Sequence, residues 1–335
     1  MAGRKGNMKY LIVDSANMFF RARHVVRGED IHTKIGMSLH ILFNSIHKVW
    51  MKFQPDHMVL CFEGRSWRKD VSELYKRNRV ALREKLSEKE RKEEEAYWEA
   101  FQDFNKFMTD KTNCTVLQHE EMEADDFIAR WTQLHTEDEH IVISSDSDFY
   151  QLLADNVSMY NGISNTLINI KGFYNDTGKE IIDKKTKEPK GAPDPEWLLF
   201  EKCMRGDTSD NIFSAYPGVR TKGTRNKVGL TEAFEDRHKK GYSWNNLMLQ
   251  RWEDHEGNEH RVKDRYEQNK ALIDLTAQPD WVKEKLDQAI STQVQQAKRP
   301  QIGIHLMKFC GKFGLTRIGE SATQHVDYLT KSYAS

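Results

Sequence analysis

The chain has 335 residues, which is enough for one large domain or for one domain with a smaller satellite. Lysine and arginine total 51, and aspartate and glutamate also total 51, so a basic field over the whole protein is excluded as the means of holding an acidic partner. Local basic patches are compatible with this balance. No apolar run approaches the roughly 20 residues of a membrane helix, and the polar start from Met1 to Lys9 has no signal-peptide core.

The four cysteines are widely separated, and none stands in a C-x-x-C pair with zinc spacing. We expect reduced, mostly buried thiols in a cytoplasmic protein that makes no membrane contact.

Short apolar runs alternate with helical patterns in the first half of the chain. The runs cover residues 10–13, 58–62, 116–117 and 141–143, and the clearest helical patterns cover 37–51 and 127–134. This alternation predicts an α/β domain built on a parallel sheet. A turn-rich stretch at 172–195 predicts a hairpin and a loop, and the pattern is helical from Trp197 onward.

A long charged segment between Gly64 and Lys111 interrupts this alternation, and residues 86–106 within it have a helical pattern. One interpretation is a solvated helix with i,i+4 ion pairs. The other is a mobile arch or lid beside the sheet. We therefore predict an α/β domain at 1–195 with an arch at about 65–111, followed by a mostly helical region at 196–335.

Acidic residues follow the predicted strands at their carboxyl ends. Residues 10–13 run into Asp14, residues 58–62 run into Glu63, and residues 141–143 are followed by Asp146 and Asp148. A single acid in such a position is usually a helix cap or a turn residue. Because the carboxyl ends of parallel strands share one edge of a sheet, several acids there indicate a site.

Two further acidic clusters extend the set. Glu123, Asp125 and Asp126 open a predicted helix, where the helix dipole favours acids and Asp126 can pair with Arg130. The second cluster, Asp207 and Asp210, alone would be an Asx-turn or a cap.

Together these nine carboxylates cannot share a site without cations, because mutual repulsion would force several to be protonated. Oxygen ligands without histidine or cysteine select Mg²⁺, for which Mn²⁺ can substitute. Two such ions suit phosphodiester hydrolysis. The predicted metal ligands are Asp14, Glu63, Glu123, Asp125, Asp126, Asp146, Asp148, Asp207 and Asp210.

The motifs LIVDSAN, EMEADD, SSDSDF and GDTSDN, in this order, resemble those of the 5′ nuclease superfamily, and the similarity is greatest to its phage ribonuclease H and 5′→3′ exonuclease branch. The resemblance implies a PIN-like α/β fold, a helical arch and a helix–three-turn–helix element that holds duplex. It assigns Asp148, Asp207 and Asp210 to a second metal, with Asp146 as a shared ligand, and the remaining acids to the first, catalytic metal. The sequence departs from the family pattern at Glu63, where Asp is usual, and in the loop from 211 to 225.

Basic residues, mixed with aromatic ones in the first case, predict two patches that bind a nucleic-acid strand, the first at 65–79 and the second at 220–225. The alternatives are an ordinary basic helix face for the first patch and a flexible exposed loop for the second. By the resemblance, Lys76 and Arg79 contact the scissile phosphate, and with Asp146 they form the expected catalytic set. The expected nucleic-acid contacts are Arg65, Arg68, Tyr75, Lys76, Arg79, Arg220, Lys222 and Arg225.

The sequence thus predicts a Mg²⁺-dependent structure-specific 5′ nuclease with exonuclease, flap endonuclease and RNase H activities, active as a monomer in phage DNA replication, primer removal and repair in the host cytoplasm. Expected substrates are duplex, flap or nicked DNA and RNA–DNA hybrids, and a single-strand-binding protein or a sliding clamp is a further candidate partner. One alternative is an inactive structure-specific DNA-binding protein, although such a protein gains nothing from acids beside phosphate. Another is a PIN-type ribonuclease acting on single-stranded RNA, against which the arch and the helical region argue.

Overall fold

The computed structural model describes residues 7–26 and 30–333, and the chain separates into two compact units. The first unit contains the residues up to Ser66, Leu86–Pro193 and Pro279–Ser335. The second contains Trp67–Lys85 and Asp194–Gln278. Both units are therefore built from segments that are discontinuous in sequence.

The first unit is organised around a seven-stranded sheet with the strand order β3-β2-β1-β4-β5-β6-β7. The first five strands in this order are parallel, and β6 and β7 are added as antiparallel edge strands. This mostly parallel sheet confirms the predicted α/β class. The strands are β1 (Lys9–Asp14), β2 (His57–Cys61), β3 (Thr115–Leu117), β4 (Glu139–Ile143), β5 (Val157–Asn161), β6 (Thr166–Asn169) and β7 (Gly172–Tyr174).

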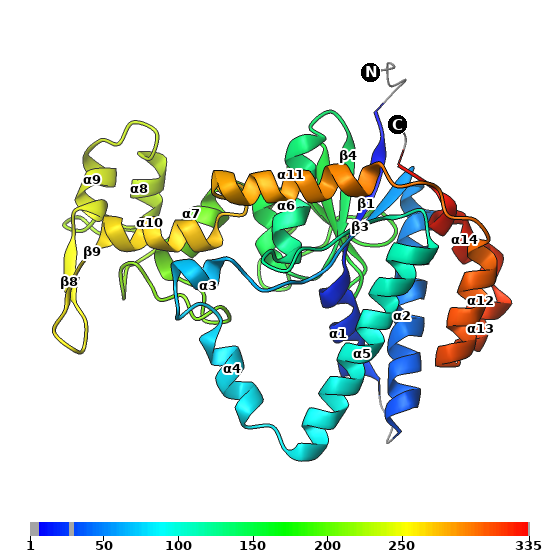
Figure 1. Ribbon diagram of the computed structural model, residues 1–335. Coiled ribbons are helices and arrows are strands. Elements are labelled where there is room, and N and C mark those ends of the chain that lie inside the picture. The colour runs from blue at the N-terminus through cyan, green and yellow to red at the C-terminus, as the bar shows by residue number, and fades with distance from the viewer. Residues whose placement is uncertain (1–6, 27–29, 334–335) are drawn as a thin grey trace. The chain divides into compact units, whose positions relative to one another are not determined.

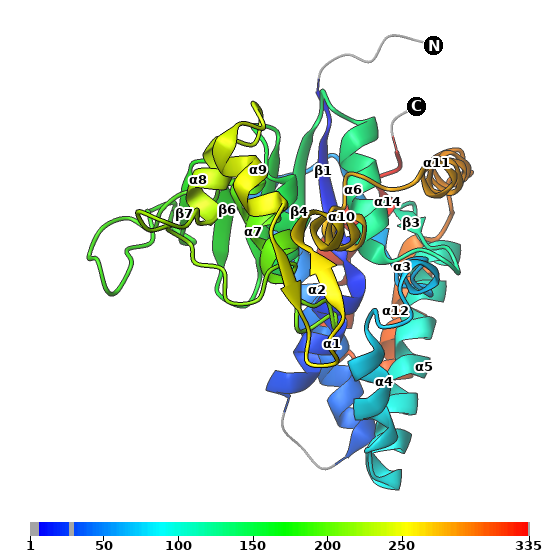
Figure 2. The same cartoon turned by 90° about the vertical axis from the view of Figure 1, so that its left-hand side faces the viewer.

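Apolar residues of the strands lie on both faces of the sheet, so the helices of this unit cover both faces. Leu11 and Val13 belong to the main core formed with α2, α5 and the last three helices, whereas Tyr10 packs edge-on against Trp131 of α6 at 5.2 Å. Figures 1 and 2 show α2 and α5 running side by side. The helices are α1 (Ser15–Val25), α2 (Ile31–Phe53), α5 (Glu88–Lys111), α6 (Ala124–Leu134), the 3₁₀ helix η1 (Ser147–Leu152), α11 (Asp280–Val294), α12 (Ile302–Phe313), α13 (Thr316–Glu320) and α14 (Ala322–Thr330).

Helix α5 changes character along its length. Its first turn has a capping box in which Ser87 and Glu90 satisfy each other's backbone N–H groups, and its first two turns are mainly exposed. Its second half buries Tyr97, Phe101 and Phe104 in the core. The second half of the predicted excursion is therefore a core helix, because these aromatic side chains recur at helical spacing.

The second unit is mainly helical and has its own core, which includes Phe200, Cys203, Leu230, Leu247 and Tyr266. Its elements are α3 (Arg68–Val71), α4 (Arg77–Glu84), α7 (Pro195–Arg205), α8 (Leu230–Glu235), α9 (Tyr242–Met248), the hairpin strands β8 (Arg251–Glu253) and β9 (Glu259–Arg261), and α10 (Val262–Ile273).

The division of the chain differs from a single boundary at residue 195 in two respects. Residues 67–85 belong to the helical unit, and residues 279–335 return to the α/β unit. The return is a consequence of apolar packing, since Leu306, Phe309 and Leu329 are buried in the main core with β1 and α2. Within the described residues, no helix is long and apolar enough to cross a membrane.

Candidate metal centre and strand-binding residues

Asp14 and Asp146 are linked through one serine at the carboxyl edge of the sheet. Strands β1 and β4 are parallel neighbours, with Val13 opposite Ile143. The Ser144 hydroxyl donates to Asp14 over 2.7 Å and accepts from the Asp146 backbone N–H over 3.1 Å. Asp14 is only 4% exposed. The structure therefore brings two predicted ligands from different strands to one buried hydroxyl.

A second pair of contacts connects the end of β2 with the start of α6. The Glu63 carboxylate accepts from the Ala124 N–H over 3.4 Å, and Glu123 accepts from the Ser66 hydroxyl over 2.8 Å. In the first turn of α6, Asp126 accepts from the Glu123 N–H over 3.0 Å. The positive end of the helix dipole favours this placement of acids.

Acids from these elements also act on the buried thiol of Cys61. Burial raises the pKa of the Cys61 thiol well above its ordinary value, and the negative charges of Asp14, Asp125 and Glu63 raise the pKa further. Three predicted ligands from β1, α6 and the end of β2 therefore act on one buried sulfur atom.

The last two acids of this unit adjoin the same edge. Asp146 caps η1 by accepting from the Asp148 N–H over 3.0 Å. Burial raises the pKa of the Tyr150 phenol, and the charge of Asp146 contributes to the rise. Asp207 and Asp210 belong to the second unit.

The donor set of the first unit fits a hard divalent cation. The candidate donors are carboxylates that follow the ends of three parallel strands or begin one helix, and Asp14, Glu123 and Asp126 among them are buried. Concentrating that much negative charge away from water requires a counter-charge, which Mg²⁺ or Mn²⁺ supplies with oxygen ligands.

Sequence reasoning did not assign roles to the neighbours that hold these acids. The backbone N–H of Asn17 donates to the Asp14 carboxylate over 3.3 Å. The side-chain oxygen of Asn17 accepts from the N–H of Ser145, over 3.1 Å, and from the Ser145 hydroxyl, over 2.7 Å. Asn17, Ser144 and Ser145 lie inside the motifs LIVDSAN and SSDSDF. Their place in these motifs was the one feature of the sequence that could have indicated a role at the site. Arg130, in turn, forms a two-pronged ion pair with Asp287 of α11, over 2.6 and 2.7 Å.

In the second unit, basic side chains hold both predicted acids. Burial alone would raise the pKa of Asp207, but hydrogen bonds from Lys202 and Ser209 outweigh it and lower the pKa. The Lys202 ammonium lies 2.7 Å from the Asp207 carboxylate. Asp210 pairs with Arg79 at 2.7 Å, and the Lys76 ammonium lies 3.9 Å from its other oxygen.

The predicted strand-binding residues divide by exposure. Arg68 and Tyr75 are 1% and 4% exposed, which contradicts their assignment to a strand-binding surface. The Arg68 guanidinium donates to the Leu272 carbonyl over 2.8 Å, and Tyr75 belongs to the core of the second unit. Tyr75 is therefore part of that core, and Arg68 donates to the backbone of its helix α10. The exposed members of the set are Arg65, Arg79, Arg220, Lys222 and Arg225, and Lys76 is half-buried.

The loop that carries Arg220, Lys222 and Arg225 is held by one acid. The Glu232 carboxylate accepts from the backbone N–H groups of Gly223, over 3.0 Å, and Gly229, over 2.8 Å. A Cβ at either glycine would lie within 2.4 Å of backbone atoms, so only glycine fits there. The loop from 211 to 225 departs from the family pattern, so its conformation could not be predicted from the resemblance. In the structure this loop is closed by Glu232.

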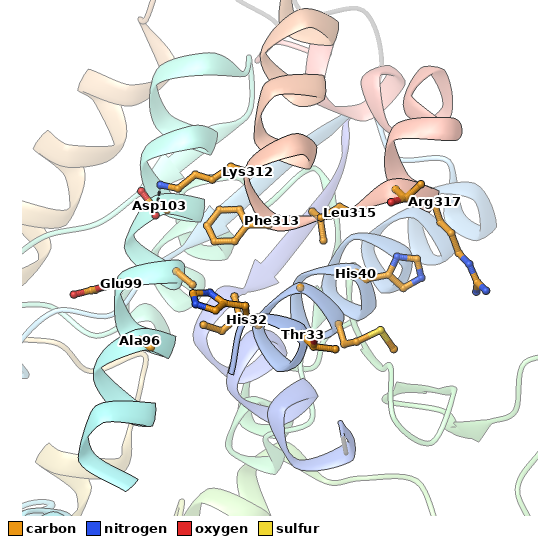
Figure 3. A pocket seen from close by; sticks show the side chains of 16 residues that line it. His32, Thr33, His40, Ala96, Glu99, Asp103, Lys312, Phe313, Leu315 and Arg317 are labelled. Carbon is orange, nitrogen blue, oxygen red and sulfur yellow. Dashed lines mark hydrogen bonds and ion pairs between the residues drawn. The ribbon is translucent and has the colours of Figure 1, made fainter. Parts of the chain in front are cut away.

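The large pocket of the first unit is separate from these acids. It has a volume of about 1010 Å³ and lies between α2, α5 and the turn from α12 to α13. Figure 3 shows His32, His40 and Arg317 at this pocket and the ion pair between Lys312 and Asp103. None of the predicted site residues lines it.

Comparison with known proteins identifies the family. A model described as the 5′-3′ exonuclease N-terminal resolvase-like domain matches residues 9–184, which include all seven acids of the first unit. The chain belongs to the 5′ nuclease family. Among relatives of this nuclease, DNA polymerase I of Rhizobium leguminosarum is 27% identical over 247 residues, which cover 70% of the chain and 21% of that polymerase. Flap endonuclease Xni of Aeromonas hydrophila is 28% identical over 235 residues, covering 68% of the chain and 76% of the relative.

Solved structures show the same fold for the nuclease. A bacteriophage T5 protein crystallised with metal ions has a TM-score of 0.58 at 19% identity, and the match covers 85% of this chain and 98% of that one. A complex of the T5 flap endonuclease with DNA and metal ions also has a TM-score of 0.58 at 19% identity, covering 86% of this chain and all of the other.

Proposed function

We propose that this protein is a Mg²⁺-dependent, structure-specific 5′ nuclease that hydrolyses phosphodiester bonds near the 5′ ends of nicked or flapped DNA duplexes and of RNA–DNA hybrids. The observation that carries the proposal is the acidic edge of the sheet, where Ser144 joins Asp14 to the backbone of Asp146 and Glu63 accepts from the Ala124 N–H at the start of α6. A site of this kind has little use except to hold divalent cations against a phosphate.

The metal ligands in this proposal are all carboxylates. Asp14, Glu63, Glu123, Asp125, Asp126 and Asp146 would hold the first cation, and Glu123 and Asp126 also cap the start of α6. Asp148, Asp207 and Asp210 would serve a second cation, with Asp146 as the shared ligand. When bound, such cations lower the pKa of a coordinated water and stabilise charge on the leaving oxygen.

The exposed basic residues fit a phosphate backbone. Arg79 and Lys76 would contact the scissile phosphate, where negative charge develops as the bond breaks. Arg65 would hold the same strand, and Arg220, Lys222 and Arg225, on the loop closed by Glu232, would grip duplex backbone without reading its sequence. The T5 flap endonuclease solved with DNA supports DNA as the substrate class.

The motif resemblance supports a role for the nuclease in phage DNA replication and repair, as a monomer in the host cytoplasm that removes primers. RNase H activity would follow from this role, because the primers are RNA paired to DNA. A single-strand-binding protein or a sliding clamp would direct the nuclease to replication sites.

The test is a cleavage assay with 5′-labelled duplex, nicked duplex, flap, RNA–DNA hybrid and single-stranded RNA, each with Mg²⁺ or with a chelator. We expect cutting of flap, nicked and hybrid substrates with Mg²⁺ alone. Asp125→Asn should lower the rate at least about a hundredfold, since several kcal/mol of charge stabilisation depend on the metal. Asp103→Asn is the matched control, because Asp103 lines the separate pocket and pairs with Lys312.

Two outcomes would reject the proposal. Tight binding of flap DNA without cleavage, under any of Mg²⁺, Mn²⁺ or Co²⁺, would indicate an inactive DNA-binding protein. Cleavage confined to single-stranded RNA would indicate a ribonuclease instead.

A covalently closed circle, compared with the same circle after nicking, tests the requirement for a 5′ end, and equal cutting of both would contradict that requirement.

A further inference from the structure

The side chain of Asn78 fastens the start of α4 to the acidic loop of the second unit. Its amide nitrogen donates to the backbone carbonyls of Thr208, over 3.0 Å, and Ser209, over 3.3 Å. Its oxygen accepts from the Arg79 N–H over 2.9 Å. Both hydrogens of one side-chain amide are therefore used on a loop that is 130 residues away in sequence.

Two more contacts join the same pair of segments. The Lys76 N–H donates to the Asp210 carbonyl over 2.8 Å, and the Asn211 side chain donates to the Leu74 carbonyl over 2.8 Å. Lys76 and Asn211 both have left-handed backbone conformations, with φ of 55° and 58°. Such conformations are unfavourable for non-glycine residues, so the surrounding contacts must maintain them.

The carboxylate of Asp210 completes the arrangement with side chains at and just before the start of α4. One oxygen pairs with Arg79 at 2.7 Å, and the other accepts from the Tyr75 hydroxyl at 3.2 Å. The Lys76 ammonium lies 5.0 Å from the centre of the Tyr75 ring. The two cations proposed to contact the scissile phosphate are thus placed by the same loop that Asn78 holds.

We propose that Asn78 is a positioning residue of the nuclease. By fixing the backbone of the 207–211 loop against the start of α4, Asn78 keeps the distance from Lys76 to Asp210 and the distance from Arg79 to Asp210 constant. This inference rests on the proposed function, in which those two cations serve the phosphate, although the fastening itself is independent of any activity. Placement errors of about 1 Å at such groups can cost a factor of about a hundred in rate.

A simpler role for Asn78 would be to stabilise the first turn of α4, where its oxygen accepts from the Arg79 N–H. Asn78→Asp separates the two roles. An aspartate keeps that acceptor, and its negative charge favours the helix start through the dipole. The same aspartate has no hydrogens to donate and places a carboxylate against two carbonyl oxygens, so it breaks the fastening.

The first experiment measures amide hydrogen exchange of the intact protein, wild type against Asn78→Asp, in the peptide that contains Lys76. If Asn78 holds the loop, the Lys76 amide, which bonds to the Asp210 carbonyl, should exchange at least about tenfold faster in the variant. Unchanged or slower exchange would overturn the inference, whatever the activity of either protein. Val80→Ala is the matched control, because Val80 is an exposed residue of the same short helix.

The second experiment is a mutant cycle on flap cleavage that combines Asn78→Asp with the paired substitutions Lys76→Ala and Arg79→Ala. We expect Asn78→Asp to lower kcat about tenfold with little change in KM, and to have less than about a twofold effect once both cations are alanine. Equal effects in both backgrounds would overturn the positioning role. If wild-type protein cleaves no substrate with any divalent cation, the proposed function fails, and the exchange experiment still decides whether Asn78 holds the loop.

Discussion

Ser144 bonds both to Asp14 on the neighbouring strand and to the backbone of Asp146, with its hydroxyl as donor at 2.7 Å and as acceptor at 3.1 Å. One hydroxyl on the β4 edge therefore sets the orientation of a carboxylate from β1 and the start of the segment that carries another. Groups that orient metal ligands in this way typically change metal affinity by about 10–100-fold when removed.

Ser144→Ala should accordingly raise the Mg²⁺ concentration that gives half-maximal flap cleavage about tenfold, because Asp14 loses the bond that fixes it. Ser38→Ala is the control, since Ser38 is equally buried and its hydroxyl lies 3.4 Å from the Tyr97 hydroxyl in the core. The control should lose stability without changing the Mg²⁺ requirement. Identical Mg²⁺ titrations for wild type and Ser144→Ala would contradict the orienting role.

Stability should fall between about pH 6.5 and pH 4 because of His57. Burial lowers the pKa of His57 from 6.5 to about 4, while the unfolded chain titrates near 6.5. Below pH 6.5 the unfolded state therefore binds a proton that the folded state does not, and folding loses up to roughly 3 kcal/mol, with the loss complete below pH 4.

His57→Gln should flatten this part of the profile. Carboxylates and other histidines contribute to acid unfolding in both proteins, so the measurement is the difference in unfolding free energy between wild type and variant, by urea titration at pH 8, 6 and 4.5. We expect wild type to lose more stability than the variant over this range. Parallel profiles would show that His57 is not the titrating group.

Glu232→Gln should weaken duplex binding several-fold without altering its salt dependence. The glutamine oxygen can still accept from both Gly223 and Gly229, but glutamine lacks the negative charge and replaces the second acceptor of Gly223 with an NH₂ donor. The loop therefore loosens, yet every cation of the loop is retained. Lys222→Ala should instead reduce the slope of log K against log salt by about 0.9, one phosphate contact. Glu235→Gln, an exposed acid on the same helix, is the control, and binding is read by fluorescence anisotropy from 50 to 200 mM salt.

Limited trypsin digestion should cut first between Arg83 and Lys92. The side chains there are mainly exposed and lie at the junction of α4 and α5, whereas α5 is anchored from Tyr97 onward by Phe101 and Phe104. Flap DNA with Ca²⁺ as a non-catalytic ion should slow these cuts if the segment contacts substrate. First cuts within 97–108 would contradict the assignment of that half of the helix to the core.

The sequence was sufficient for the four strands β1 to β4 and for the acids at their ends, because buried parallel strands are continuous apolar runs and their ends are marked by charge. Asp14 and Glu63 could be placed at one edge from this rule alone. The roles of Arg68 and Tyr75 could not be predicted. A basic or aromatic side chain in a charged segment is predicted to be exposed unless its tertiary partners are known. The contacts of Asn78 with Thr208 and Ser209 join segments 130 residues apart and have no periodic signal in the sequence.

The same limit applies to the division of the chain, because apolar helical periodicity at 302–313 does not say which core the helix enters. That helix completes the α/β unit, together with Tyr328 and Leu329 of α14. The main core therefore cannot close during synthesis until the final helices have left the ribosome, and a fragment ending at Gln278 would expose the apolar faces of α2 and α5 that these helices cover. Folding of this unit must wait for contacts between chain ends about 300 residues apart, a separation that slows folding and favours aggregation of incomplete chains.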